Sequence, residues 1–349
     1  MAHILALTLG DPAGIGPDIA IAAWQRRQEL GLPPFYLLAD PDFVRRRARQ
    51  IGTSLALSVV EPTAAETTFR SALPVVDIDV DVTAEPGRPD ESSAPAALGA
   101  IRRAVADVCS GVAAAVVTNP VAKNVLYRSG FTEPGHTEYL AKLAEESTGV
   151  PAQPVMLLWS PELAVVPVTI HLPLKDVVAK LTTDLIVETG RIVAHDLRFR
   201  FGIAKPRLAI AGLNPHAGEQ GTLGAEDLAV VEPAVQRLIA EGIDARGPLA
   251  ADSMFHQAAR ATYDVALAMY HDQALIPIKT LAFEHAVNVT LGLPFVRTSP
   301  DHGTAFDIAG TGRADPSSLI AAIQLAARIS AHSAQTVPPP YRSPLAGKG

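Results

Sequence analysis

The sequence predicts an α/β fold built on largely parallel sheets. Short aliphatic runs alternate along the chain with longer Ala-rich segments, which is the pattern of repeated strand–helix–strand units. Several of the runs are apolar throughout, as expected for strands that helices cover on both faces. Aromatic residues make up only 5% of the chain, so the core must consist mainly of Ala, Val, Ile and Leu. This favours helices packed on a sheet over a β-sandwich.

The alternation assigns each element to a stretch of sequence. The predicted strands are Ile4–Leu9, Phe35–Ala39, Ala113–Thr118, Leu163–Ile170, Arg207–Leu213 and Asp264–Tyr270. The predicted helices are Pro17–Leu30, Ala96–Ser110, Thr137–Ser147, Thr183–Phe199, Ala225–Glu241, Met254–Ala261 and Ser317–Ser330. Two proline-containing stretches are expected outside these elements, a surface loop over 83–95 and a frayed end over 334–349.

Bulk properties exclude several classes of protein. The net charge of −7 is spread over 349 residues without long runs of one sign, unlike a nucleic-acid-binding surface. No apolar stretch approaches the ~20 residues of a membrane span, and the first residues do not resemble a signal peptide. The single Cys109 rules out an intramolecular disulfide and suits a reducing compartment. We therefore expect a soluble, cytoplasmic protein in which Cys109 is a buried, inert helix residue.

Three histidines share one sequence context. His171, His216 and His271 each follow a predicted strand, and open parallel sheets bind ligands beyond the carboxyl ends of their strands. Three imidazoles that meet there would suit Zn²⁺, Co²⁺ or a related divalent ion. A single histidine after a strand more often caps the strand end, and this alternative stays open. The histidines expected to be surface or structural residues are His3, His195, His256, His285 and His332.

Two glycine-rich stretches are candidate ligand loops. In Gly10–Asp18 the glycines allow a tight turn before a helix, but Ile19 occupies the third glycine position of the dinucleotide fingerprint. No phosphate-binding P-loop is present. The stretch 301–316 is rich in small and polar residues, so its backbone could approach a ligand closely. Either stretch could equally be an ordinary turn or loop.

Other residues indicate an anion site. The segment Gly135–Glu138 opens a predicted helix with Thr137 as a candidate N-cap, and free amides at a helix start bind anions. Lys279, Asn288 and Arg297 lie among apolar neighbours, where buried polar groups need partners. Those partners are either carboxylates of the chain or the phosphate and carboxylate of a substrate.

Taken together, these segments resemble the 4-hydroxythreonine-4-phosphate dehydrogenase family of vitamin B6 biosynthesis. The similarity runs from Leu9 to Asp315. A more distant similarity links the glycine stretches to isopropylmalate and isocitrate dehydrogenases, which bind the dinucleotide without a Rossmann fingerprint. The telling segments are Leu9–Pro17, Gly135–Glu138, His171–Leu174, Asn214–Glu219, Met269–Gln273, Val287–Pro294 and Asp301–Ala305.

The resemblance implies two α/β domains with a cleft between them. The first, on the dinucleotide side, is expected over 1–125 and 275–349, and the second, with the metal ligands and dimer contacts, over 126–274. It also implies a homodimer whose metal and substrate sites use both subunits. No nucleic acid or membrane partner is implied.

The family's site residues can be carried over position by position. The metal ligands fall on His171, His216 and His271, and two neighbours, Ile170 and Ala274, depart from the residues common in the family. The substrate contacts fall on His136, Thr137, Lys279, Asn288 and Arg297, and the candidate cofactor contacts on His302, Gly303, Thr304 and Asp315.

The reaction that the resemblance implies is oxidation of the C3 hydroxyl of 4-phosphooxy-L-threonine by NAD or NADP. The β-keto acid formed would lose CO₂ to give 3-amino-2-oxopropyl phosphate. One divalent ion (zinc, magnesium or cobalt) would bind the hydroxyl and the amino group. The proton acceptor could be Lys279, Asp252 or Asp272.

Three other functions compete with this one. A sister dehydrogenase could act on 4-phospho-D-threonate, another phosphorylated hydroxy acid or a cis-dihydrodiol carboxylate. A non-catalytic metal- or phosphate-binding protein could keep the same scaffold. A metal-dependent hydrolase would need carboxylate-rich two-metal ligation, whereas the candidate ligands here are imidazoles.

Overall fold

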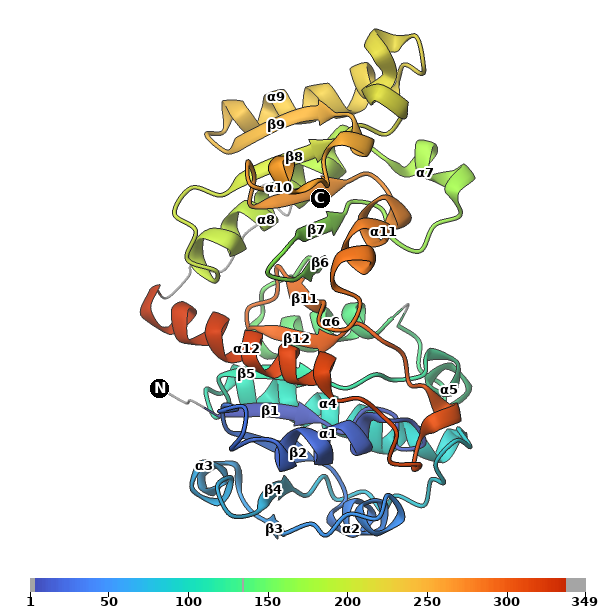
Figure 1. The fold of residues 1–349 in the computed structure, drawn as a ribbon, viewed down its shortest axis with the longest axis vertical. Helices are drawn as coiled ribbons and strands as arrows, with labels where there is room; N and C mark the ends of the chain where they lie inside the picture. Colours follow the sequence, from blue (N-terminus) through green and yellow to red (C-terminus); the bar gives the residue numbers. More distant parts are fainter. Residues whose placement is uncertain (1–3, 134, 337–349) are drawn as a thin grey trace. The chain divides into compact units, whose positions relative to one another are not determined.

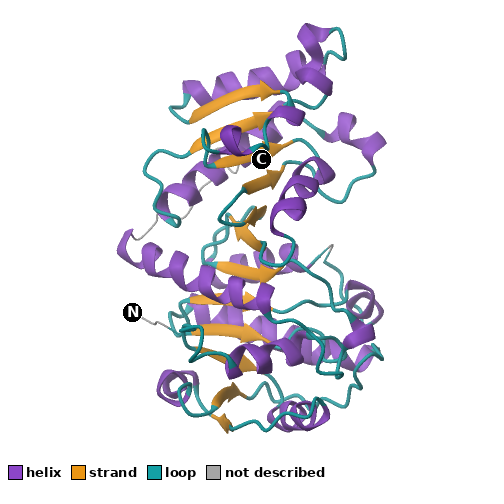
Figure 2. Ribbon diagram, viewed as in Figure 1, coloured by secondary structure: helices purple, strands orange, loops and turns teal. Residues whose placement is uncertain are grey.

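The chain folds into two units, each built around six β-strands covered by helices (Figures 1 and 2). The structure is a computed structural model that describes residues 4–133 and 135–336. The first unit extends to Pro154 and resumes from Leu293 to Ala334, and the second is Val155–Gly292. The domain boundaries expected after residues 125 and 274 stay predictions. No helix in the described ranges is long and apolar enough to cross a membrane.

The strands of the first unit pair in parallel throughout. Its strand order is β3-β4-β2-β1-β5-β12. The central strands β1, β2 and β5 are fully buried, which explains why their sequences are apolar on both faces. The strands are β1 (Leu5–Thr8), β2 (Phe35–Leu38), β3 (Leu57–Val59), β4 (Leu73–Val76), β5 (Ala115–Thr118) and β12 (Arg297–Pro300).

Helices α4 and α12 lie on opposite faces of this sheet (Figure 1). Local signals set several helix ends: Asp40 caps α2 by accepting a hydrogen bond from the Asp42 amide, and Gly149 ends α6 in a left-handed conformation. The helices are α1 (Gly16–Gln25), α2 (Pro41–Gln50), α3 (Ala65–Thr68), α4 (Ala94–Cys109), α5 (Lys123–Arg128), α6 (His136–Thr148) and α12 (Ser317–Thr336), with 3-10 turns at Pro62–Ala64, Glu91–Ser93 and Phe306–Ile308.

The strands of the second unit pair in both parallel and antiparallel directions. Their order is β11-β6-β7-β10-β8-β9, where β6 pairs antiparallel with both neighbours and the other pairs are parallel. The parallel set β7-β10-β8 carries the three histidines at its carboxyl ends. The strands are β6 (Val155–Trp159), β7 (Ala164–Pro167), β8 (Arg207–Ala211), β9 (Asp244–Leu249), β10 (Val265–Ala268) and β11 (Val287–Leu291).

The core of the second unit lies between this sheet and its helices. Helix α11 packs against β7 and β10, while α8 lies behind the sheet in the view of Figure 1. Thr182 caps α8 by accepting a hydrogen bond from the Leu185 amide. The helices are α7 (Leu174–Lys180), α8 (Thr183–Phe199), α9 (Glu232–Ala240), α10 (Gln257–Arg260) and α11 (His271–Ala282), with shorter turns at Pro215–Gly221, Asp227–Val231 and Ala251–Ser253.

The predicted α/β class with largely parallel sheets is confirmed, and each predicted strand contains an observed one. Several details differ. Six observed strands, β3, β4, β6, β9, β11 and β12, have no predicted counterpart, and the helix expected over Pro17–Leu30 already ends at Gln25. The helix expected over Met254–Ala261 shrinks to α10, because His256 caps it by accepting from the Ala259 amide. The loop expected over 83–95 ends in the 3-10 turn Glu91–Ser93, since Pro95 fits the first turn of α4. Cys109 is exposed on the last turn of α4.

A further difference concerns the chain end. Helix α12 extends through Thr336, so residues 334–336 are helical rather than frayed. The rest of the tail expected to fray, 337–349, lies outside the described residues, as does His3.

Candidate functional site

Three adjacent parallel strands of the second unit end in histidine-bearing segments. Strand β10 pairs with β7 on one side and with β8 on the other. His271 is the first residue of α11, directly after β10. His171 follows β7, and His216 lies in the turn after β8. The register of the sheet therefore carries all three histidines to one edge.

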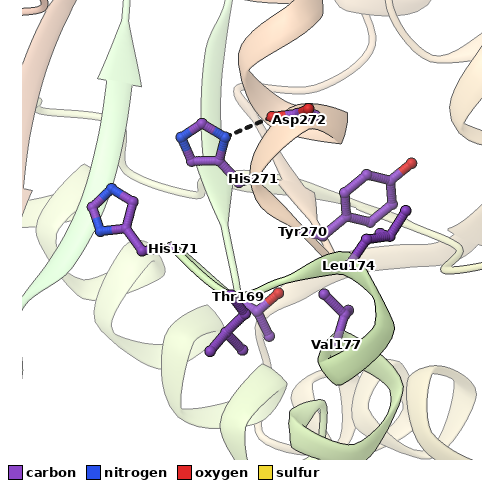
Figure 3. Close-up of a pocket in the computed structure, with 8 residues that line it drawn as sticks. Thr169, His171, Leu174, Val177, Tyr270, His271 and Asp272 are labelled. Atoms are coloured by element: carbon purple, nitrogen blue, oxygen red, sulfur yellow. Dashed lines mark hydrogen bonds and ion pairs between the residues drawn. The ribbon is translucent and has the colours of Figure 1, made fainter.

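Two of these histidines line one pocket (Figure 3). The pocket has a volume of about 310 Å³, and the ring centres of His171 and His271 lie 5.8 Å apart. The Asp272 carboxylate lies 2.7 Å from Nδ1 of His271 and so orients that ring. The lining residues are Thr169, His171, Leu172, Leu174, Val177, Tyr270, His271 and Asp272.

The other predicted members of this site lie outside the pocket lining. His216 is exposed on its turn, and Asp252 is exposed on the 3-10 turn Ala251–Ser253. Over the described ranges, no group of three His, Cys, Asp or Glu side chains is close enough to hold a metal ion. The structure thus brings together two of the three predicted ligands and one predicted acid.

Backbone conformation sets His171 and His216 apart from ordinary strand-end residues. Both have a φ of 51°, in the left-handed region that costs an L-residue roughly 1–2 kcal/mol. The whole stretch 216–220 is left-handed. Such conformations persist only where the surroundings enforce them, and they cluster at functional sites. Local sequence offers no clear signal for them.

A set of polar contacts that sequence reasoning missed joins the three strand ends. The Thr169 hydroxyl donates to the Met269 carbonyl at 2.7 Å, which links the ends of β7 and β10. The Gln273 side chain links β10 to Gly212 at the end of β8. Asp227 accepts hydrogen bonds from the chain just beyond β8. Gln273 stands in one of the family-like segments, whereas nothing in the sequence marks Asp227.

A second candidate site lies in the first unit, at the start of α6. Gly135 precedes the helix and His136 is its first residue; Thr137 is therefore a helix residue rather than the predicted N-cap. The His136 Nε2 atom is shielded from solvent and has no hydrogen-bond partner among the described residues. Burial, followed by the charges of Arg297 and Lys123, holds the pKa of His136 well below its usual 6.5. The ring is consequently neutral at physiological pH.

Arg297 supplies a buried positive charge near this ring. It is the first residue of β12 and only 4% exposed. Its Nε and Nη2 atoms donate to the Thr118 hydroxyl at 3.1 and 2.6 Å. Burial lowers the pKa of Arg297 to about 10, so the guanidinium stays charged. Buried cationic surroundings of this kind favour an anionic ligand. Lys123, at the start of α5, is a cation that sequence reasoning did not single out.

The remaining predicted substrate residues belong to the second unit. Lys279 lies on α11, with its Nζ atom 5.3 Å from the centre of the Phe283 ring. Asn288 is half-buried in β11. His136, Thr137 and Arg297 thus lie in one unit, and Lys279 and Asn288 in the other.

The two glycine-rich stretches meet in the first unit. The Ile15 amide donates to the Thr304 carbonyl at 3.0 Å, and the Gly310 amide to the Asp18 carboxylate at 3.2 Å. A Cβ on Gly14 would lie 2.9 Å from the Thr304 carbonyl oxygen, so only glycine permits this approach. The Arg47 guanidinium lies 2.6 Å from the same Asp18 carboxylate, and this buried ion pair holds the carboxylate in place for the Gly310 amide.

The other predicted cofactor residues lie along the second of these stretches. Asp315 accepts hydrogen bonds from the amide and hydroxyl of Ser317 at the start of α12, and these bonds lower the pKa of Asp315. His302 Nδ1 lies 2.9 Å from the Gly303 carbonyl oxygen. Asp315 therefore also serves as a helix cap, a role that is independent of any cofactor.

Comparison with known proteins extends this picture. The chain matches the family described as pyridoxal phosphate biosynthetic protein PdxA over residues 32–326. It is 63% identical to a 4-hydroxythreonine-4-phosphate dehydrogenase of Bradyrhizobium diazoefficiens, covering 94% of this chain and 97% of the relative. It is 60% identical to the enzyme of that name from Xanthobacter autotrophicus, covering 93% of each chain.

Solved structures of similar proteins have the same fold as this chain. The 4-hydroxythreonine-4-phosphate dehydrogenase of Klebsiella pneumoniae superposes with a TM-score of 0.82 at 36% identity, over 95% of this chain and 98% of that one. A terephthalate 1,2-cis-dihydrodiol dehydrogenase of Burkholderia xenovorans gives 0.63 at 32% identity, over 94% and 98%. With a family match over most of its length and relatives aligned almost end to end, the chain belongs to the PdxA family of pyridoxal phosphate biosynthetic proteins.

Proposed function

We propose that the chain is a dehydrogenase that oxidises 4-phosphooxy-L-threonine at its C3 hydroxyl. The observation that carries the proposal is the pocket between His171 and His271 at the ends of two parallel strands, in a chain whose relatives of 60–63% identity bear the name of this activity. Bound NAD or NADP would supply the acceptor for the hydride from C3, and the hydroxyl proton would pass to a base of the chain. The resulting β-keto acid loses CO₂ to give 3-amino-2-oxopropyl phosphate.

We further propose that His171, His216 and His271 hold a divalent ion, with zinc, magnesium and cobalt as the candidates. Two imidazoles that bind one ion at about 2.0–2.1 Å have ring centres roughly 5–6 Å apart, and those of His171 and His271 are 5.8 Å apart. His216 lies outside the pocket lining in this structure, and it would be the third donor because its turn follows the strand next to β10. A divalent ion there would act as a Lewis acid on the substrate hydroxyl.

The anionic groups of the substrate are assigned to two sets of polar residues, of which Arg297 and Lys279 carry the positive charge. His136, Thr137 and Arg297 form one binding set, supported by the shielded His136 Nε2 atom and the buried guanidinium. Lys279 and Asn288 form the second. A neutral His136 can donate one hydrogen bond to a phosphate or carboxylate oxygen, while Arg297 supplies the charge.

The cofactor is assigned to the loop that carries His302, Gly303 and Thr304, and to Asp315. The close contact between this loop and the glycine turn before α1 supports the assignment. It places the loop beside the first turn of a helix, where backbone amides bind anionic groups such as the phosphates of a dinucleotide. NAD and NADP remain equal candidates.

Three acidic or basic residues are candidates for the proton acceptor. Asp272 is engaged with His271 at 2.7 Å, which favours an orienting role for it. Lys279 and Asp252 are then the remaining candidates. The pH profiles of kcat for variants that lack Lys279 or Asp252 distinguish these two residues. Only the variant that lacks the true base loses the ionisation of that base from its profile.

We also propose a homodimer that works in the cytoplasm. Large apolar side chains are exposed on α7, on α11 and directly after α11 in the second unit, among them Leu174, Val178, Ile276 and Phe283, and a second copy would cover them. Leu174→Glu should produce monomers in analytical ultracentrifugation. Val59→Glu, at an exposed site in the first unit, is the control. Fractionation of cells with an antibody to the chain tests the location.

One experiment tests the activity and its nearest alternative together. Purified enzyme is given NAD⁺ or NADP⁺ with 4-phosphooxy-L-threonine, 4-phospho-D-threonate or a cis-dihydrodiol carboxylate, and reduction is followed at saturating cofactor. The threonine phosphate should react fastest. The last substrate is included because a dihydrodiol dehydrogenase shares the fold, and preference for either alternative would overturn the assignment.

A second experiment tests the metal site. His216→Ala should lose bound metal, measured by elemental analysis, together with turnover. His285→Ala, which removes a surface histidine paired with Glu162, is the matched control. Unchanged metal content and rate in His216→Ala would refute the site.

A further inference from the structure

One side chain bridges the ends of β8 and β10. The Gln273 Oε1 atom accepts a hydrogen bond from the Met269 amide at 2.6 Å, and its Nε2 atom donates to the Gly212 carbonyl at 2.8 Å. The backbone pairing of the two strands ends with Leu267 opposite Ile210. Met269 and Gly212 lie two positions further along in the same register, so the Gln273 side-chain amide joins the two strands beyond the end of their backbone pairing.

The segment beyond Gly212 is held from its other side by Asp227. This buried carboxylate accepts hydrogen bonds from the amides of Leu213 and Asn214 at 2.7 and 3.1 Å, and from the Asn214 side chain at 3.0 Å. The packing leaves no room at Gly212, where a Cβ would lie 2.6 Å from the Ala217 Cα atom. Hydrogen bonds and close packing therefore fix the chain just before the left-handed turn that carries His216.

We propose that Gln273 is a positioning residue that sets the His216 turn against the strand end carrying His271. Gln273 lies in the first turn of α11, the helix that begins with His271. One short segment therefore carries both the candidate ligand His271 and the side chain that contacts the strand end before the His216 turn. The inference rests on the proposed function, in which both histidines bind one ion. A glutamine is required because the bridge needs an acceptor toward Met269 and a donor toward Gly212.

The test uses the full-length protein loaded with Co²⁺. Gln273→Glu keeps the acceptor and loses the donor, whereas Gln273→Met loses both at similar volume. Thr280→Val is the control, because it removes a side-chain hydrogen bond to a carbonyl on the same helix. Co²⁺ affinity is measured by chelator competition, the ligand field by visible absorption, and the mobility of the turn by hydrogen exchange of amides 212–220.

Both Gln273 variants should bind Co²⁺ about 10- to 100-fold more weakly, with a changed absorption band and faster exchange of amides 212–220. The control should match the wild type. Wild-type affinity and spectrum in Gln273→Glu would overturn the proposal, even with faster exchange, since the residue would then only stabilise the turn. If the wild type binds no Co²⁺, the metal site of the proposed function fails. Hydrogen exchange of amides 212–220 then tests the Gln273 bridge by itself. Faster exchange in Gln273→Glu but not in the control supports the bridge, and equal exchange in the two variants overturns it.

Discussion

The rings of His171 and His271 lie 5.8 Å apart at the ends of two paired parallel strands. Their proximity follows from register: β7 and β10 run side by side, and the Thr169 hydroxyl ties the chain beyond β7 to the Met269 carbonyl at 2.7 Å. Residues that are far apart in sequence thus meet through backbone pairing, and the pocket depends on that pairing as much as on the histidines.

Asp272→Asn should weaken metal binding without changing stability. The carboxylate lies 2.7 Å from the His271 ring, but it is 71% exposed, so its loss leaves no buried group unpaired. Loss of a residue that orients a ligand typically costs about 10- to 100-fold in metal affinity. Chelator competition measures the effect. Asp244→Asn, which removes the same charge at an exposed site, should bind metal as the wild type does; an equal loss in both variants would contradict the orienting role.

Arg297→Lys should raise KM for the substrate far more than it lowers kcat. A lysine keeps the charge but not the planar fork that recognises a carboxylate or phosphate. A hydrogen bond to a charged group contributes about 1.5–3 kcal/mol, so a rise of about 10- to 100-fold in KM is expected. Steady-state kinetics with varied substrate checks this. Arg246→Lys, at an exposed position, should leave KM unchanged, and an unaffected KM in Arg297→Lys would remove Arg297 from the binding set.

The stability of the protein should fall as the pH drops below about 6.5. Burial, reinforced by Arg297 and Lys123, keeps the pKa of His136 well below 6.5 in the folded state, whereas the unfolded chain binds this proton at about pH 6.5. The unfolded state therefore binds more protons below that pH, and the free energy of unfolding decreases.

The substitution His136→Gln isolates this contribution. Urea unfolding between pH 7 and 5.5 should show a steeper loss of stability in the wild type than in His136→Gln, by up to about 1.4 kcal/mol per pH unit. Parallel curves for the two proteins would mean that the ring binds its proton equally well in the folded and unfolded states, which would contradict a lowered pKa of His136.

Arg47→Met should destabilise the first unit strongly. Arg47 and Asp18 are 1% and 3% exposed and 2.6 Å apart, and removing one partner of a buried pair costs about 3–5 kcal/mol because the other charge stays buried. Arg45→Ala is the matched control on the same helix, since its pair with Asp42 is exposed and contributes at most about 1 kcal/mol. Urea unfolding compares the two. A loss in Arg47→Met as small as that in Arg45→Ala would contradict the prediction.

Much of the fold could be predicted because its central strands are covered on both faces. Runs such as Phe35–Leu38 are buried at every position, and that demand is written into the sequence as an unbroken apolar run. Strand β12 (Arg297–Pro300) is equally buried but polar in sequence. Its arginine and its threonine donate hydrogen bonds to partners far along the chain, Thr118 and Ala322, which local patterns do not reveal.

The same division applies to the candidate site. The sequence by itself determined that His171, His216 and His271 follow strands, because strand ends are visible as local changes of pattern. Only the tertiary structure decided that β10 lies between β7 and β8, and that Gln273 bridges the ends of β8 and β10. Strand order, register and left-handed turns depend on contacts between distant segments, and their free energy exists only once the chain has folded.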